Sequence, residues 1–396
     1  MDTRRHGPRG SSSWTRKSST LADPMFFKRS LSSRMALKHG PFLCGLARTA
    51  SRGLTLALLA SAGLLTGATA LQQVGDTTFQ PTIADPAFEA GQGPRVVIDE
   101  AHFNFHTVDG RYQSFARVLR ADGFVVEASD QLFSERTLAN ADLLVISNAL
   151  NARNQTDWSL PTPSAFTTSE IDAVHTWVER GGALLLIADH MPFPGAAEAM
   201  AAAFDFELNN GFAVDTTDGS PFVFRVSDGT LGTHPVVTGR SPAERVDSVA
   251  TFTGEAFLAP PRSVSLLTLR EGIVSLMPEV AWEFGPDTRT VEVGGWVQGS
   301  VMEVGRGRLA VFGEAAMFSA QRQGPESNPM GMNAPVASQN VQFLVNLVRW
   351  LSDVRGAGHV SYGALHEVIC HVLHLACYCD DSSTAGLPRA SHASAF

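Results

Sequence analysis

Cysteine is scarce in this sequence of 396 residues, and its four occurrences lie near the two ends of the chain. No cysteine occurs between Leu71 and Ser361, so a fold built from that stretch contains neither a disulfide nor a thiol nucleophile. This absence is compatible with an oxidising compartment. It also argues against acyl transfer through a catalytic cysteine.

Other absences exclude further classes of cofactor and partner. The chain has no phosphate loop of the Gly-x-x-x-x-Gly-Lys type and no glycine-rich dinucleotide fingerprint after its first strand, so a nucleotide cofactor is disfavoured. The formal net charge is −9, and most of the basic excess lies in the first 52 residues. Nucleic-acid binding relies on concentrated Lys and Arg, so we expect no nucleic-acid partner.

The basic N-terminal stretch leads into an apolar run over residues 53–65, followed by the small residues of Ala68-Thr69-Ala70. This order is typical of a secretory signal, and residues 1–70 are predicted to be a basic leader with cleavage after Ala70. An uncleaved anchor is the alternative, but the run falls short of the roughly 20 apolar residues that span a bilayer. The prediction is export to the periplasm or the exterior, with membrane contact through this segment only.

Residues 71–93 lack periodicity and are predicted to be a linker. From Pro94 short apolar runs alternate with helical periods, which is typical of an α/β fold with a mostly parallel sheet covered on both faces. Within residues 206–304 short strand-like runs separated by turn residues indicate an antiparallel insertion or extension. A capping box begins a helix at Thr167, and a last helix is expected over residues 341–351. The domain should therefore occupy residues 94–353.

Residues 354–396 show no clear period. They hold Cys370, His371, His374, Cys377 and Cys379, whose clustering is similar to zinc-ligand spacing. The spacing does not match the common paired-knuckle pattern, so a disordered tail is the favoured interpretation.

Three apolar runs end in acidic or histidine residues. Residues 96–98 lead into Asp99, residues 184–188 into Asp189, and residues 309–313 into Glu314. The carboxyl ends of parallel strands share one edge of the sheet, where α/β proteins bind ligands. We therefore expect Asp99, His102, Asp189 and Glu314 to converge on one cleft.

The densest polar group follows the first of these strands and contains Asp99, Glu100, His102, Asn104 and His106. Carboxylates and imidazoles together can hold a divalent metal, activate water or act as acid and base. In the alternative interpretation Asp99 caps the following loop and both histidines bond to backbone.

The other two strand ends offer fewer groups. Asp189 is a candidate ligand or base with His190 beside it, or else a cap on the helix that follows. Glu314 is a catalytic candidate or a loop brace, and Ser319, just beyond it, is a candidate ligand contact, as is His190. His234 begins a compact motif, residues 234–239, that is predicted to lie in a loop and to contact ligand.

The sequence resembles the class I glutamine amidotransferase-like superfamily over residues 94–353, through the motifs at residues 96–106, 181–190, 234–239 and 307–319. The likeness is to a bacterial domain-of-unknown-function branch related to trehalose-utilisation (ThuA-like) proteins and to the amidotransferase-like domain of an intraflagellar transport protein. It implies a flavodoxin-like, doubly wound fold. Where true amidotransferases hold the cysteine nucleophile, this chain has Asp189, so glutaminase activity is not implied.

Three hypotheses follow. The first is an exported amidotransferase-like domain that binds a small polar ligand, such as a carbohydrate, at the strand-end cleft. The second is a hydrolase, with or without a divalent metal, that uses the Asp, Glu and His cluster. The third is a non-catalytic domain that engages an envelope protein through its β-rich middle segment.

Overall fold

The computed structural model describes residues 73–217, 219 and 221–353. The predicted signal and the cysteine-rich stretch after residue 354 lie outside these residues. Within the described part, no helix is both long enough and apolar enough to cross a membrane.

The main sheet contains nine strands and is mixed. Its order is β3-β2-β4-β5-β15-β14-β10-β6, with β11 also paired to β14. The first five strands in this order run parallel to one another, and β14 is antiparallel to β15. The parallel strands are β2 (Arg95–Asp99), β3 (Val125–Ser129), β4 (Leu143–Ser147), β5 (Ala183–Ile187) and β15 (Gly307–Phe312).

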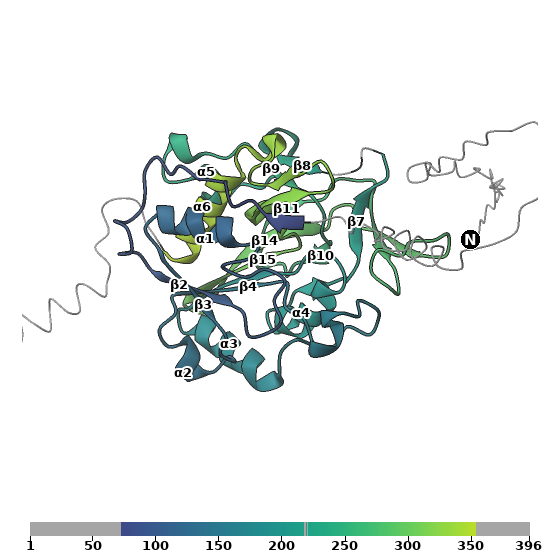
Figure 1. The fold of residues 1–396 in the computed structure, drawn as a ribbon, viewed down its shortest axis with the longest axis horizontal. Coiled ribbons are helices and arrows are strands. Elements are labelled where there is room, and N and C mark those ends of the chain that lie inside the picture. The colour runs from purple at the N-terminus through teal and green to yellow at the C-terminus, as the bar shows by residue number, and fades with distance from the viewer. Residues whose placement is uncertain (1–72, 218, 220, 354–396) are drawn as a thin grey trace, which may run out of the picture. The chain divides into compact units, whose positions relative to one another are not determined.

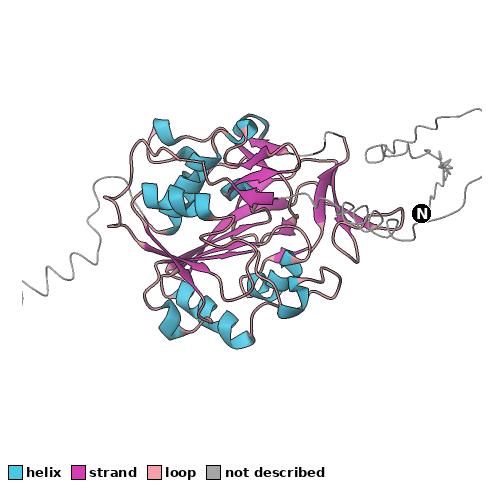
Figure 2. Ribbon diagram, in the orientation of Figure 1, coloured by secondary structure: helices cyan, strands magenta, loops and turns pink. Residues whose placement is uncertain are grey.

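Helices cover both faces of this sheet (Figure 1, Figure 2). One face carries α1 (Gln113–Ala121), α5 (Pro235–Thr238) and α6 (Asn340–Leu351), and the other carries α2 (Glu135–Leu138), α3 (Thr168–Glu179) and α4 (Phe193–Ala202). The strands are apolar on both sides: Leu185 and Ile187 join one core cluster, whereas Leu184 and Leu186 join the other. Near-continuous apolar strands need cover on both faces, and the predicted α/β class is confirmed.

The predicted antiparallel region is also observed. β6 (Glu207–Leu208), β10 (Phe257–Leu258), β11 (Val264–Thr268) and β14 (Val297–Val304) extend the main sheet. A separate sheet has the order β13-β12-β7, and β8 pairs with β9. These strands are β7 (Phe212–Asp215), β8 (Phe222–Arg225), β9 (Ser248–Thr251), β12 (Ile273–Met277) and β13 (Arg289–Glu292). The hairpin from β14 to β15 turns at Gly305, whose φ of 58° suits glycine.

The stretch predicted as a linker is instead packed on the domain. β1 (Gln73–Gly75) pairs with β16 (Ala320–Gln323), which pairs with β17 (Asn328–Gly331). Asp76 is buried and accepts hydrogen bonds from Arg322 Nε at 2.8 Å and Asn333 Nδ2 at 3.0 Å. The ordered unit therefore begins well before Pro94. Single-sequence patterns miss it because the three-residue strand is too short to show a period.

Short 3₁₀ turns complete the fold at η1 (Ala152–Gln155), η2 (Val226–Asp228), η3 (Pro242–Glu244), η4 (Ala316–Phe318) and η5 (Pro335–Ala337). The predicted capping box is present: Thr167 Oγ1 accepts from the Glu170 amide, and Glu170 Oε2 accepts from the Thr167 amide at 3.0 Å. This arrangement fixes Glu170 at the start of α3.

Candidate functional site

Asp189 and Glu314 lie side by side at the carboxyl edge of the sheet. β5 and β15 are parallel neighbours with Ile187 opposite Phe312, and each carboxylate stands two residues beyond its member of that pair. Adjacent strands are about 4.8 Å apart, so the register brings two residues 125 positions apart together. Their exposed fractions are 5% and 0%, respectively.

Asp189 is held by hydrogen bonds from its own loop and from two other segments. Its Oδ1 accepts from the His190 amide at 2.8 Å and from Thr253 Oγ1 at 3.3 Å, while its own amide donates to Asn148 Oδ1 at 2.9 Å. Among the described residues no donor contacts its Oδ2. Helix α4 begins after Pro192 without a side-chain cap, so Asp189 is not the helix cap that the alternative interpretation expected.

Glu314 braces the loop that follows β15. Its carboxyl oxygens accept the amides of Ala316 at 2.9 Å and Met317 at 2.7 Å, as the loop-bracing alternative expects. Burial raises the pKa of Glu314 well above its ordinary value, and the negative charge of Asp189 raises it further. The Glu314 carboxyl is consequently held toward its protonated form beside Asp189.

A third carboxyl, that of Glu255, completes this group. The sequence analysis did not predict it as a site residue. It is fully buried, and its Oε2 accepts the amides of Asn209 and Asn210, both at 3.0 Å. Burial raises the pKa of Glu255 well above its ordinary value, and the charge of Asp189 adds to that shift. Glu255 follows no strand end of the parallel sheet, so the pattern that found Asp189 could not find it.

Close backbone packing positions Glu255 beside Glu314. Gly254, with φ of 123°, lies so near the loop that a Cβ there would be 2.2 Å from the Gly313 oxygen and 3.1 Å from Glu314 Cβ. Gln298 of β14 donates from Nε2 to the Glu255 carbonyl at 3.1 Å. Two buried oxygens in this region, Glu255 Oε1 and Gln298 Oε1, have no hydrogen-bond partner within the described part of the chain. Such orphaned acceptors point to a water or ligand.

An aromatic wall flanks the carboxylates. The His190 ring stacks on Phe212 with centroids 4.6 Å apart at 12°, and Trp282 contacts it edge-on at 4.6 Å. His190 Nδ1 bonds to the Met191 carbonyl at 2.8 Å, which leaves Nε2 for another partner. Trp282 is 50% exposed and Phe284 is 44% exposed. Trp282 also has φ of 70°, a conformation that a bulky residue rarely adopts.

A second group near the carboxylates is buried and consists of His106, Ser147 and Tyr112. His106 Nδ1 lies 3.3 Å from Ser147 Oγ, and the Tyr112 hydroxyl donates to the Ala315 carbonyl at 3.2 Å. Burial lowers the pKa of His106 to about 3, assisted by the charges of Arg111 and His190, so its imidazole is neutral at physiological pH. Burial raises the pKa of Tyr112 well above its ordinary value, and Glu314 and Asp189 contribute to the shift.

Asp99 and His102 form a separate group at the same edge. His102 Nδ1 contacts Asp99 at 2.9 Å, and its Nε2 contacts Glu170 Oε1 of α3 at 2.9 Å. Burial opposes the charge on the ring, yet the two carboxylates raise the pKa of His102 above its ordinary value. Glu170 approaches from α3, whereas Tyr112 precedes α1 on the other face, so the two groups are reached from opposite faces of the sheet.

Hydrogen bonds nevertheless connect the two groups, and the expectation that all four side chains line one cleft stays a prediction. Both ring nitrogens of His102 are occupied by carboxylates rather than by backbone, and Asp99 Oδ1 also accepts the Ala101 amide at 3.1 Å. Asn104 links the groups, since its Nδ2 donates to Asp99 at 3.0 Å and to the Ser147 carbonyl at 3.4 Å. Glu100 accepts the Val108 amide at 2.7 Å. These contacts brace the loop.

Two other predicted ligand contacts lie elsewhere. Ser319 is buried behind the Glu314 loop, where its hydroxyl donates to the Ala316 carbonyl at 2.9 Å. His234 is the N-cap of α5, accepting the Val236 amide at 3.2 Å, and its ring packs on Trp350. Burial lowers the pKa of His234 to about 4, and the charge of Arg308 contributes. Arg308 lies near the amino end of β15, so His234 is far from the carboxyl edge.

Within residues 73–217, 219 and 221–353, no three His, Cys, Asp or Glu side chains are grouped so that they could hold a metal ion.

Comparisons with known proteins give structural likeness only. No protein-family model matches the chain, and no curated protein matches it in sequence. The N-terminal domain of mmIFT52 is similar at 13% identity and a TM-score of 0.47, covering 67% of this chain and all of that one. A ThuA-like protein from Bacteroides uniformis is similar at 13% identity and a TM-score of 0.36, over 68% of this chain and 94% of that one. A cytoplasmic protein from Salmonella typhimurium is similar at 18% identity and a TM-score of 0.36, over 65% of this chain and 99% of that one. Function must be argued from the site itself.

Proposed function

We propose that this chain is a flavodoxin-like, amidotransferase-like domain without the cysteine nucleophile, which binds a small polar ligand beside Asp189 and Glu314. The parallel strand order β3-β2-β4-β5-β15 corresponds to the order 2-1-3-4-5 of flavodoxin-like sheets, and this supports the fold assignment. In that topology ligands bind outside the carboxyl ends of the strands.

The observation that carries the proposal is a group of buried carboxyls without a cation. Asp189, Glu255 and Glu314 have exposed fractions of 5%, 0% and 0%, and no ion pair to any of them is found among the described residues. Burying acids in this way costs stability unless hydrogen bonds replace the lost water. Ligand hydroxyl groups could both donate to Asp189 Oδ2 and accept from a protonated carboxyl. The group therefore favours a neutral ligand rich in hydroxyls.

The aromatic wall narrows the ligand class. Phe212, Trp282 and Phe284 pack against one another beside His190, with ring centroids of the first two 4.7 Å apart. Small-molecule sites combine such apolar surfaces with a few fixed polar groups. A pyranose ring presents an apolar face of C–H groups and an equatorial belt of hydroxyls. Carbohydrate is accordingly the ligand class that we infer.

The proposal is for binding without catalysis. No cysteine occurs among the residues that the structure describes, and His106 is neutral and turned toward Ser147. The metal-dependent hydrolase needs a ligand set that the described residues do not form.

The test is ligand-observed NMR on the purified protein with a panel of neutral methyl pyranosides and, as acyclic polyols, sorbitol and mannitol. We expect saturation transfer to at least one pyranoside and none to the polyols. Asp189→Asn and Trp282→Ala should each reduce the signal strongly, whereas Asp172→Asn on the exposed face of α3 should not. Transfer that persists in both site variants, or is absent for every pyranoside, would refute the proposal.

A further inference from the structure

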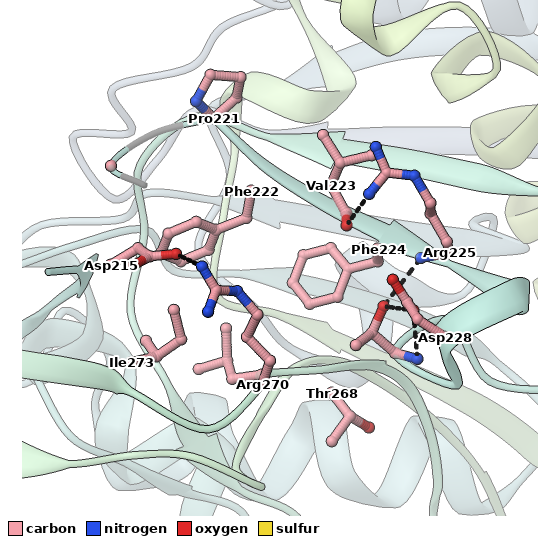
Figure 3. A pocket seen from close by; sticks show the side chains of 13 residues that line it. Asp215, Pro221, Phe222, Val223, Phe224, Arg225, Asp228, Thr268, Arg270 and Ile273 are labelled. Atoms are coloured by element: carbon pink, nitrogen blue, oxygen red, sulfur yellow. Dashed lines mark hydrogen bonds and ion pairs between the residues drawn. The ribbon is translucent and has the colours of Figure 1, made fainter. Parts of the chain in front are cut away.

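A cavity lies at the other end of strand β7 from the aromatic wall. Its volume is about 270 Å³, and it is lined by residues of β7, β8 and β12 and the adjoining turns (Figure 3). Asp215 of this cavity is three residues along β7 from Phe212, a separation of about 10 Å. The cavity is therefore distinct from the carbohydrate site that we propose.

The floor of this cavity is apolar. Phe222 and Phe224 stand two residues apart on β8, so their rings share one side of the strand (Figure 3). Phe224, Leu269 and Ile273 have exposed fractions of 3%, 3% and 1% and belong to the main hydrophobic core. A ligand that fills the cavity must place an apolar body on this floor.

The rim carries charges of both signs. Arg270 pairs with the buried Asp215, whose Oδ1 also accepts from Thr217 Oγ1 at 2.7 Å. On the other side Arg225 and Asp228 are both exposed. The ion pair between Arg270 and Asp215 thus closes one side of the cavity.

Arg225 and Asp228 retain binding capacity. The Arg225 side chain donates one long hydrogen bond, from Nη1 to the Val223 carbonyl at 3.3 Å. Asp228 Oδ1 accepts both the amide and the hydroxyl of Thr230, at 3.0 and 2.6 Å, and the Arg225 backbone and side-chain charge also lower the pKa of this carboxyl, so it is held as an exposed carboxylate. A guanidinium binds a carboxylate through paired N–H groups, and a carboxylate accepts from an ammonium.

We propose that this cavity binds a free α-amino acid with an apolar side chain. The side chain packs on Phe222, Phe224 and Ile273, the carboxylate bonds to Arg225, and the ammonium bonds to Asp228 Oδ2. The volume lies just below the range of about 300 to 1,000 Å³ that is usual for small-molecule sites, which suits a ligand of this size. Arg225 ends β8 and Asp228 ends the η2 turn directly after it, so the two charges lie close together, as the two charges of an amino acid require.

The test is calorimetric titration of the full chain with L-phenylalanine and L-leucine. Each should bind, while N-acetyl-phenylalanine and phenylalaninamide, which each lack one charge, should bind at least about tenfold more weakly. Equal affinity for all four compounds, or no binding of either amino acid, would overturn the proposal.

Variants assign the binding to this cavity. Arg225→Gln and Asp228→Asn should raise the Kd for L-phenylalanine by at least about tenfold; Asn can still accept from Thr230 and keep the turn. Arg245→Gln is the matched control, because Arg245 is also an exposed arginine, pairs with Asp247 and does not line the cavity. Asp189→Asn should also leave this Kd unchanged, so failure here is distinguishable from failure of the carbohydrate proposal. An unchanged Kd in both Arg225→Gln and Asp228→Asn would contradict the assignment.

Discussion

Replacing Glu255 by Gln should make the protein more stable at neutral and alkaline pH and leave it nearly unchanged near pH 4.5. Protonated Glu and Gln have almost the same shape, and the side-chain oxygen of Gln can still accept the Asn209 and Asn210 amides. Burial and the nearby charge of Asp189 raise the pKa of Glu255 in the folded state above its ordinary value of 4.5. In the wild type, ionisation of this buried group should therefore cost stability.

The sign and magnitude follow from proton linkage. Between the unfolded pKa and the raised folded pKa, the native state binds more protons than the unfolded state, so the free energy of unfolding falls as pH rises. One group contributes a slope of about 1.4 kcal/mol per pH unit. The advantage of Glu255→Gln should begin near pH 4.5, grow by about that amount per unit, and stop growing at the folded pKa.

Urea unfolding at pH 5, 6, 7 and 8 measures this difference. The control is Glu279→Gln, which removes an exposed carboxylate and should give a curve parallel to the wild type. A Glu255→Gln curve parallel to the wild type would show that Glu255 is ionised at every pH tested, and the account of the buried carboxyl group would be wrong.

Three other predictions concern the fold and the ends of the chain. Arg349→Met should lower the free energy of unfolding by about 3 to 5 kcal/mol in a urea titration, because buried Asp122 and Glu244 lose their shared cation; a loss below 1 kcal/mol would contradict this. Because Glu244 is held at a pKa of about 2, that contribution should be present above pH 4.5 and disappear as pH falls toward 2. Removal of residues 73–93 should lower the thermal midpoint by several degrees, since Asp76 and β1 pack on β16; an unchanged midpoint would restore the linker interpretation. N-terminal sequencing of protein from the native host should find a start near Leu71, and an intact leader in the cytosol would contradict export.

The parallel half of the fold could be predicted because its signals are local. Continuous apolar strands such as β4 and β5 and the Thr167 capping box are each visible in a few consecutive residues. The adjacency of Asp189 and Glu314 could also be anticipated, since strand ends of a parallel sheet share an edge. β1 could not, because its only evidence is pairing with a strand some 250 positions away.

The site itself was predictable only in part. Glu255 comes from the antiparallel region, and its position depends on the contact between Gly254 and Gly313, which no local pattern encodes. The role of His102 depended on Glu170, 68 positions away, which occupies the ring nitrogen that a ligand would need. Polar density after a strand therefore located the edge but could not separate carboxyls that lack an ion pair from groups that brace one another.

The most direct test of the carbohydrate site is the Kd of the tightest-binding pyranoside for the wild type and for Asp189→Asn. Asn keeps the shape of the side chain and can still accept from the His190 amide, so the fold should be retained while the free carboxylate oxygen becomes an amide donor. The account predicts at least about a tenfold rise in Kd, with Asp172→Asn unchanged. An equal Kd for wild type and Asp189→Asn would contradict it.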